Sequence, residues 1–126
     1  MAAHDLPPLL DLTQLWAMES DFPSPEPVHR FVEDFILIWN DRLVRLRNAL
    51  AEGDHPAAVN VLLGIKVSAV MIGATQLKYV AEAIESELRQ GTAGVTKDLL
   101  DALAECGTQT IHQLSRKYLH RTSLYG

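Results

Sequence analysis

The chain has 126 residues, which is enough for one hydrophobic core and too few to suggest two independently folding domains. Apolar residues make up 48% of it and charged residues 21%, a globular composition that excludes a disordered chain. The formal net charge is -5 and Lys and Arg form no run, which argues against binding to a nucleic-acid backbone.

The cysteine content and the N-terminus bear on the compartment. Cys106 is the single cysteine, so no intramolecular disulfide is possible, and its place on a helical apolar pattern predicts a buried thiol. The N-terminus lacks the basic region, apolar stretch and cleavage site of a secretory signal. No apolar run approaches the ~20 residues that cross a bilayer. We therefore expect a cytoplasmic protein that does not enter a membrane.

The first part of the chain predicts two helices. Residues 1–8 are expected to be a frayed lead-in, followed by a short helix whose apolar side includes Leu12 and Leu15. Three prolines in residues 21–27 predict a connection, because an interior proline disrupts a helix. Residues 28–52 contain neither Gly nor Pro, and their apolar residues recur at mostly three- and four-residue steps, which predicts one long amphipathic helix. These apolar positions are Phe31, Phe35, Ile38, Trp39, Leu43, Leu46 and Leu50.

Glycines delimit the next two helices. Gly53 and Asp54 supply the end of the long helix and the N-cap of the following one, which we predict over residues 56–72. Gly73 interrupts the pattern, and a further helix is expected to end at Gly91. Its apolar positions are Leu77, Val80, Ala81, Ile84 and Leu88.

Thr96 is placed to cap a last helix, whose apolar positions are Leu99, Leu103, Cys106, Ile111, Leu114 and Tyr118. Residues 120–126 are expected to form a flexible tail. No segment has the period-two alternation of a strand, and the short loops favour antiparallel neighbours. The expected fold is all-α, an antiparallel up-down four-helix bundle with a short extra N-terminal helix. We expect a single domain over residues 1–126, with its core at about 9–119.

Residues 62–77, LLGIKVSAVMIGATQL, resemble the core motif of histidine phosphotransfer (HPt) domains, which typically reads HSLKGSAANIGA followed by a few residues and Leu. Lys66, Ser68 and the run Ile72-Gly73-Ala74 match this motif without a gap. The likeness covers roughly residues 9–115, with Gly53-Asp54 upstream and Gly91 downstream also matching. The resemblance implies a helical bundle of two-component phosphorelay signalling, with a receiver domain or a histidine kinase as its partner.

Two positions depart from the motif. The phosphorylated histidine of the family corresponds to Leu63, and the glycine that leaves room for an incoming receiver domain corresponds to Val67. Phosphotransfer needs a nucleophilic imidazole nitrogen, and leucine has no lone pair to offer. None of the five histidines is a turn-neighbour of Leu63, and each is expected to be solvated or capping. We therefore predict no catalytic residue and no enzyme activity at this site.

The helix over residues 56–72 carries a second apolar stripe. At about 100° per residue, Val59, Leu63, Val67 and Val70 lie opposite the core-facing residues, flanked by Asn60, Lys66 and Met71. A helix apolar on two sides needs burial on both, and exposed apolar patches commonly mark binding sites. The candidate partner-binding residues are therefore Val59, Asn60, Leu63, Lys66, Val67 and Val70.

Two questions about this stripe stay open at the level of the sequence. Lys66 is expected either to pair with a carboxylate of the partner or to be solvated. The alternative to an interface is that the N-terminal segment, with Trp16, covers the stripe inside the monomer. A weaker candidate for an accessory contact is the pair Leu37 and Val44, which project away from the core stripe of their own helix.

The acidic residues in the C-terminal half of the chain are not expected to form a metal site. They lack the Glu-x-x-His spacing of a di-metal bundle and are expected to lie on solvated faces. They are Glu82, Glu85, Glu87, Asp98, Asp101 and Glu105. The sequence therefore predicts no metal and no other cofactor.

Three functions are compatible with these patterns. The first is a non-phosphorylatable HPt-like protein that docks a receiver domain or a histidine kinase. The second is a self-associating bundle, a homodimer with no phosphorelay role, held by the stripe around Leu63. The third is an active phosphotransferase that uses an unexpected residue, and the absence of a nucleophile near Lys66 makes it the weakest of the three.

Overall fold

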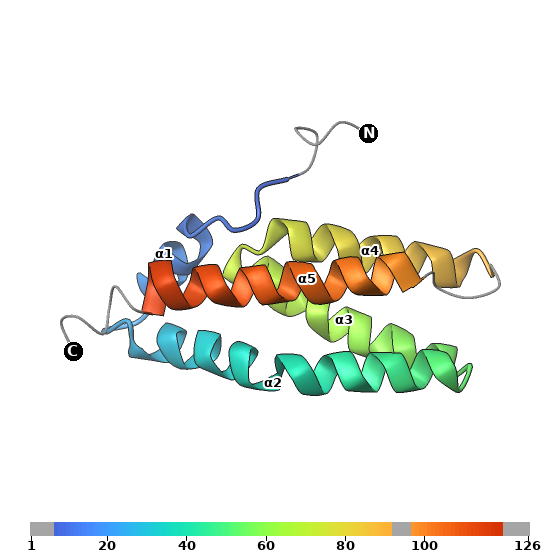
Figure 1. Ribbon diagram of the computed structural model, residues 1–126. Coiled ribbons are helices and arrows are strands. Elements are labelled where there is room, and N and C mark those ends of the chain that lie inside the picture. Colours follow the sequence, from blue (N-terminus) through green and yellow to red (C-terminus); the bar gives the residue numbers. More distant parts are fainter. Residues whose placement is uncertain (1–6, 92–96, 120–126) are drawn as a thin grey trace.

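The computed structural model describes residues 7–91 and 97–119, and the regular structure in these residues is all helical. Four long helices pack side by side with neighbours antiparallel, and a short helix lies at one end (Figure 1). The elements are α1 (Thr13–Glu19), α2 (Glu26–Ala51), α3 (His55–Ile72), α4 (Thr75–Arg89), α5 (Lys97–Gln113) and a final π-helical segment η2 (Leu114–Leu119). The predicted antiparallel up-down four-helix bundle with a short extra helix is confirmed.

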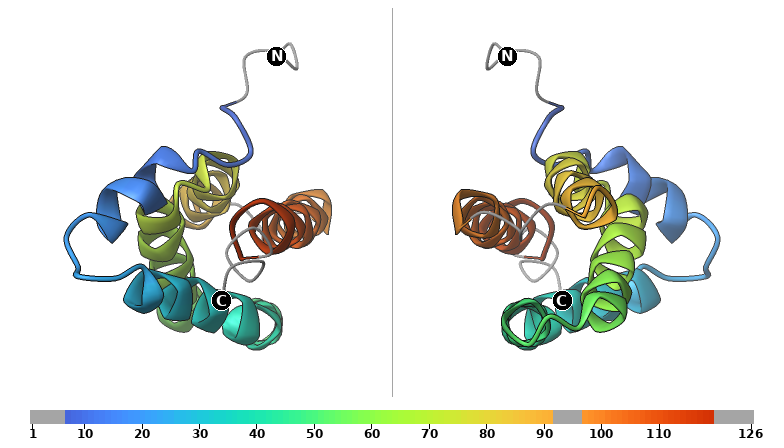
Figure 2. Two further views of the ribbon diagram at one scale, coloured as in Figure 1. Left: turned by 90° about the vertical axis from the view of Figure 1, so that its left-hand side faces the viewer. Right: turned by 90° about the vertical axis from the view of Figure 1, so that its right-hand side faces the viewer.

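Seen along the bundle, α2, α3, α4 and α5 surround a common centre, and α1 lies on the outer side of α3 at one end (Figure 2). The core consists of the inward-facing apolar side chains of these helices, with Phe35, Leu46, Leu62, Ile65, Leu77, Ile84 and Leu103 fully buried. The predicted stripe of α2 is less uniform: Phe31 and Leu50 are only half-buried, and Ile38 is exposed.

Local signals in the sequence explain where α2 and α3 begin. Pro27 lies in the first turn of α2, where its missing N–H is harmless, so the helix begins two residues earlier than predicted. The Asp54 carboxylate accepts a hydrogen bond from the backbone N–H of Ala57 at 3.1 Å, which confirms the predicted N-cap of α3. Thr96, the expected cap of the last helix, lies outside the described residues.

Gly73 is required twice at the turn from α3 to α4. Its φ of 81° is left-handed, a conformation that favours glycine. Its carbonyl also accepts a hydrogen bond from the backbone N–H of Asp11 at 2.8 Å, and a Cβ on residue 73 would lie 2.1 Å from the Asp11 carbonyl oxygen. This close backbone approach ties the N-terminal segment to the middle of the chain.

The end of the lead-in is held against α4, which differs from the frayed segment that we expected. The Gln76 side chain donates a hydrogen bond to the Pro7 carbonyl at 2.8 Å, and the Thr75 hydroxyl donates one to the Pro8 carbonyl. Both donors lie in the first turn of α4. Residues 1–6 and the predicted flexible tail 120–126 lie outside the described residues.

The last helix changes from α-helical to π-helical near its end, which the apolar pattern did not predict. It continues as the π-helical η2, and the buried Tyr118 of η2 donates its hydroxyl to the carboxylate of Glu19 on α1. The His29 ring of α2 lies edge-on to Tyr118 at 5.0 Å, with its Nε2 3.6 Å from Glu19 Oε2. The prediction of a solvated or capping His29 is wrong, because this side chain is only 18% exposed and lies against both α1 and η2.

Two adjacent residues of α5, Cys106 and Gly107, are buried in the core. Cys106 is buried, as predicted, and burial raises the pKa of its thiol. The ring of Trp39 packs against Gly107, where a Cβ would lie only 2.0 Å from Trp39 Cζ2. The absence of a side chain at position 107 therefore lets α5 approach the indole of α2.

By length and composition, α3 is long and apolar enough to cross a membrane, contrary to our expectation that no run approaches such a span. The core helix of a bundle meets the same criteria, and α3 packs against both α2 and α4 in this fold. Its high hydropathy arises because two of its sides are apolar, and only one of them faces the core.

Candidate functional site

The second stripe of α3 lies on the surface. Leu63 and Val67 are each 50% exposed, and Val70 is 53% exposed. Asn60 and Met71 are also exposed, whereas Val59 is half-buried and packs against the core. We call the exposed residues Asn60, Leu63, Val67, Val70 and Met71 the α3 face, from which the predicted Val59 is largely withdrawn.

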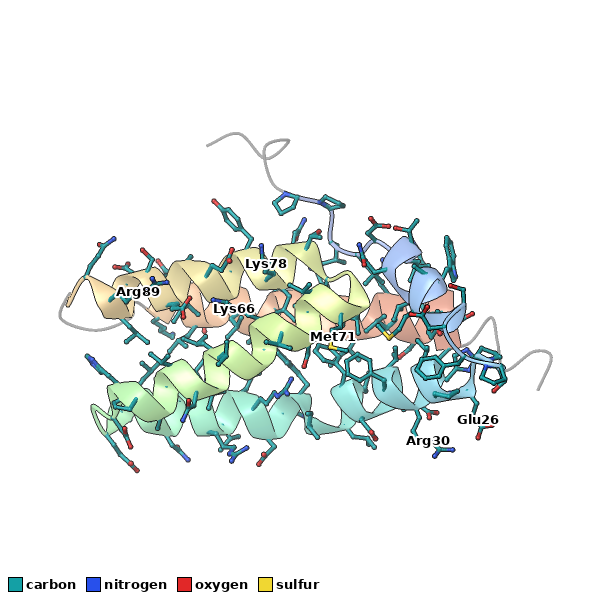
Figure 3. All side chains as sticks on the ribbon, turned by 180° about the vertical axis from the view of Figure 1, so that it is seen from behind. Glu26, Arg30, Lys66, Met71, Lys78 and Arg89 are labelled. Atoms are coloured by element: carbon teal, nitrogen blue, oxygen red, sulfur yellow. The ribbon has the colours of Figure 1, made fainter. Side chains whose placement is uncertain are left out.

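The α3 face exists because apolar residues continue around the helix beyond its core side. Ala58, Leu62, Ile65, Ala69 and Ile72 are fully buried. Leu63 and Val67 follow Leu62 by about 100° and about 500° of helical rotation, which carries them to the outer side. Figure 3 views the molecule from this side, with α3 in front of the core and between α4 and α2.

The N-terminal helix does not cover the α3 face. α1 lies at the end of the bundle that contains Gly73 and buries Leu15, while Trp16 is itself 47% exposed. Figure 3 shows α1 beyond Met71, at one end of α3, with the part of α3 around Lys66 uncovered by it. The alternative in which Trp16 covers the stripe inside the monomer is therefore wrong for the described part of the chain.

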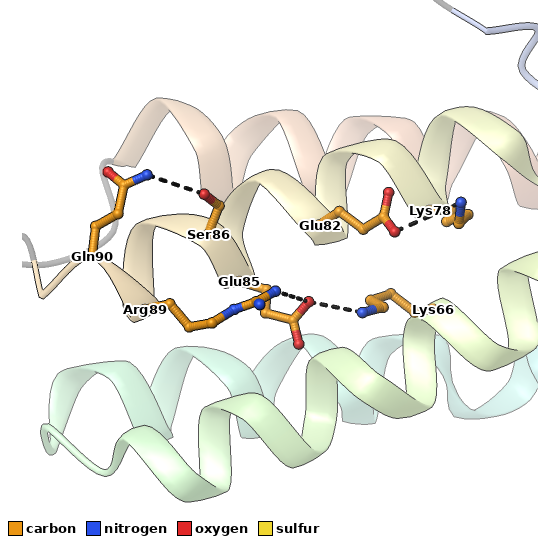
Figure 4. A network of polar contacts seen from close by, with 7 residues as sticks. All are labelled: Lys66, Lys78, Glu82, Glu85, Ser86, Arg89 and Gln90. Atoms are coloured by element: carbon orange, nitrogen blue, oxygen red, sulfur yellow. Dashed lines mark hydrogen bonds and ion pairs between the residues drawn. The ribbon is translucent and has the colours of Figure 1, made fainter.

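Lys66 borders the α3 face but is engaged within the protein. Its ammonium donates a hydrogen bond to Glu85 Oε1 on α4 at 2.7 Å, and Arg89 donates to the same oxygen at 3.0 Å (Figure 4). The Lys66 side chain is 22% exposed. Of the two expectations for Lys66, solvation is wrong, and pairing occurs with a carboxylate of the same chain.

Glu85 was not recognised from the sequence as part of this site. Its side chain is 12% exposed, so the prediction of a solvated carboxylate is wrong at this position. The hydrogen bond from Lys66 is the main cause that lowers the pKa of Glu85, against a smaller opposing effect of burial. The carboxylate is therefore charged near neutral pH and neutralises the lysine beside Leu63.

Arg42 of α2 is a second residue that sequence reasoning missed. Its Nη1 donates a hydrogen bond to the Ser68 hydroxyl at 3.1 Å, and its Nη2 would lie 3.5 Å from a Cβ on Gly64. Gly64 and Ser68 line the α2 side of the same helix whose outer side carries Leu63 and Val67. Arg42 therefore places a half-buried guanidinium at the edge of the α3 face.

The remaining candidates lie away from this face. Leu37 and Val44 are exposed, at 77% and 52%, but they project from the side of α2 opposite its buried residues. His55, the histidine nearest to Leu63 along the chain, is exposed at the first position of α3. Within residues 7–91 and 97–119, no group of three His, Cys, Asp or Glu side chains is arranged to hold a metal ion.

Comparison with known proteins identifies the family. Residues 30–116 match the family model of the Hpt domain, which covers well over half of the chain. No curated protein and no solved structure matches the chain. The matched residues span nearly all of α2, the whole of α3 and α4, and α5, so the match includes the α3 face. The chain belongs to the Hpt domain family, whose members serve phosphotransfer-type signalling and typically interact with receiver domains or kinases.

Proposed function

We propose that this protein is a non-phosphorylatable Hpt protein of two-component signalling, which acts by docking a receiver domain or a histidine kinase on its α3 face. The observation that carries the proposal is the half-exposed Leu63 at the centre of that face. In the family motif this position holds the histidine, so the surface that meets partners is retained in place while its nucleophile is replaced.

The chemistry of transfer supports the first half of the proposal. In phosphotransfer, a bond forms between an imidazole nitrogen and phosphorus while the bond from phosphorus to the receiver carboxylate breaks. Leu63 offers only methyl groups at this point. Lys66, which the resemblance assigns to assisting the phosphoryl group, is already neutralised by Glu85 at 2.7 Å. Leu63 thus lacks the bond-forming atom, and the lysine of the motif is engaged by a carboxylate of the same chain.

The energetics of burial support the second half. Fully burying an aliphatic side chain yields roughly 1.5–3 kcal/mol, so covering the exposed halves of Leu63, Val67 and Val70 yields on the order of 1 kcal/mol each. Patches of this kind on soluble proteins mark interaction sites. We propose in addition that the protein is cytoplasmic and that it acts by occupying its partner, without turnover.

Two assays on the purified full chain test it. In the first, a radiolabelled phosphorylated receiver domain is incubated with this protein and, in parallel, with an Hpt protein that carries the histidine. We expect acid-labile label on the second protein only. Stoichiometric acid-labile phosphorylation of any histidine in this chain would falsify the non-phosphorylatable assignment.

The second assay measures binding. Purified receiver domains and histidine-kinase dimerisation domains from the same genome are titrated as a panel, with size measurement over a dilution series in parallel. We expect a monomer that binds one or a few members of the panel. A tight dimer that Leu63→Glu dissociates without unfolding, together with no binding to any member, would support the homodimer instead.

A further inference from the structure

The half-buried Lys and Arg side chains among the described residues differ in whether a carboxylate compensates their charge. Among the described residues, Lys66 and Lys78 are half-buried, and each has a carboxylate within 4 Å, from Glu85 and Glu82. Arg42 is the half-buried cation in this part of the chain that has none. Its hydrogen-bond partner is the neutral hydroxyl of Ser68.

The surroundings of Arg42 disfavour its charge instead of compensating it. Burial, and then the charge of Arg45, lower the pKa of the Arg42 guanidinium, which nevertheless stays protonated as arginine does in proteins. Arg45 itself has Asp41 at 3.6 Å. A guanidinium has five N–H donors in a planar fork, and the residues that the structure describes supply Arg42 with a single acceptor. The others are left to solvent or to a binding partner.

The position of Arg42 links this charge to the α3 face. The guanidinium lies over Gly64, where no side chain intervenes, and reaches Ser68 one turn later. Asn60 and Val67 of the α3 face are the helical neighbours of Gly64, four residues before and three after it. A partner that covers Leu63 and Val67 therefore also removes water from Arg42.

Removing water from an unpaired charge is expensive, so the partner has to replace the water with an acceptor. We infer that the partner of the α3 face presents a carboxylate side chain to Arg42, beside an apolar patch that covers Leu63 and Val67. A carboxylate accepts two parallel N–H bonds from the guanidinium fork, which fixes orientation as well as affinity. The inference rests on the proposed function and specifies the chemistry of its partner.

A second copy of this chain fits the requirement poorly. In a two-fold symmetric contact the same face meets itself, so each Arg42 needs a carboxylate from the other copy's α3 face. Among the described residues, the half-buried carboxylate bordering that face is Glu85, and it already accepts from Lys66 and Arg89. The charge pattern therefore favours a different protein with an acidic surface.

The test uses the receiver or kinase domain that binds most tightly in the panel described above. Its dissociation constant is measured for wild type, Arg42→Gln and Arg42→Lys, with Arg45→Gln as the matched control on the exposed side of α2. We expect Arg42→Gln to weaken binding by at least about tenfold and to reduce its salt dependence, because a desolvated charge pair is lost. Arg42→Lys keeps the charge without the fork and is expected to fall between the two, and Arg45→Gln to stay within about twofold.

A measurement of stability and a comparison with Leu63→Glu complete the test. The urea unfolding midpoint of Arg42→Gln is expected to be no lower than that of wild type, so that a loss of binding is not a loss of folding. Binding of Arg42→Gln within twofold of wild type at both low and high salt, while Leu63→Glu abolishes binding, would overturn this inference and leave the proposed function intact. The absence of any binder in the panel overturns the proposed function and this inference with it.

Discussion

The Lys66 ammonium donates a hydrogen bond to Glu85 Oε1 across the contact between α3 and α4, at 2.7 Å. In the family motif this lysine follows the phosphorylated histidine by three residues, and here it follows Leu63. The lysine charge, which the resemblance assigns to a phosphoryl group, faces a carboxylate of the neighbouring helix in this chain. Under the proposed function, the loss of transfer therefore involves this internal ion pair as well as the leucine at position 63.

The acid limb of the stability profile should depend on this pair. The pKa of Glu85 is lowered in the folded protein, so its contribution is fully present above its unfolded pKa of about 4.5 and is lost as pH falls through the lower folded value. Glu85→Gln should cost about 1 kcal/mol at pH 7 and flatten the loss of stability as the pH falls below the unfolded pKa of Glu85. Urea unfolding at a series of pH values measures both effects. Glu33→Gln, at an exposed position of α2, is the control, and an equal effect of the two substitutions contradicts the assignment.

Restoring the histidine alone should not restore transfer. Leu63→His supplies the nucleophile but leaves Val67 on the adjacent turn and Lys66 bound to Glu85. We expect little phosphorylation of Leu63→His, more for Leu63→His/Val67→Gly, and most when Glu85→Gln is added to free the lysine. Phosphoryl transfer from a labelled receiver, followed over time, ranks the three variants. Efficient labelling of the single variant shows that neither the valine nor the ion pair limits the reaction.

Two glycines in helix interiors should respond oppositely to the same substitution. Gly64→Ala adds a Cβ at an ordinary contact distance of 3.5 Å from the mobile end of Arg42, so the gain in helix propensity dominates. We expect the free energy of unfolding to rise by about 0.5–1 kcal/mol. Gly107→Ala places a Cβ 2.0 Å from the buried Trp39 ring, and we expect a loss of about 2–3 kcal/mol. Denaturant unfolding with tryptophan fluorescence compares them, and a Gly107→Ala variant as stable as wild type refutes the packing described.

The reactivity of Cys106 should report on unfolding. The thiol is buried, and burial raises its pKa, so the nucleophilic thiolate is scarce in the folded protein. We expect a thiol reagent such as DTNB to modify the native chain at least about a hundredfold more slowly than the chain in denaturant. The rate should rise with urea in parallel with the fluorescence transition. Fast modification of the native protein at pH 7 contradicts the burial of α5 against the core.

The helices and the apolar stripe of α3 could be predicted because both follow from periodicity. The spacing of Leu62, Leu63, Ile65 and Val67 gives the direction of each side chain about the helix axis, whatever the neighbours are. Family resemblance then assigned the outer direction to the partner-facing side. What periodicity does not give is which element lies over that side.

The contacts that were missed depend on how the helices sit beside one another. Lys66 and Glu85 are separated by 19 positions, and Arg42 and Ser68 by 26, so no local spacing connects them. The position of α1 depends on contacts between distant parts of the chain, which include the backbone hydrogen bond from Asp11 to Gly73 and the hydrogen bond from Tyr118 to Glu19. For that reason the sequence alone could not decide whether Trp16 covers the stripe.

The central claim is that Leu63 lies at the centre of a docking surface. The most direct test is the affinity of the bound receiver or kinase domain for Leu63→Glu, compared with Leu37→Glu. Both substitutions place a carboxylate at an exposed leucine of a long helix, and only the first lies on the α3 face. We predict that Leu63→Glu weakens binding by at least about a hundredfold while the protein stays folded, and that Leu37→Glu changes it less than about threefold. Equal affinities for the two variants would contradict the account.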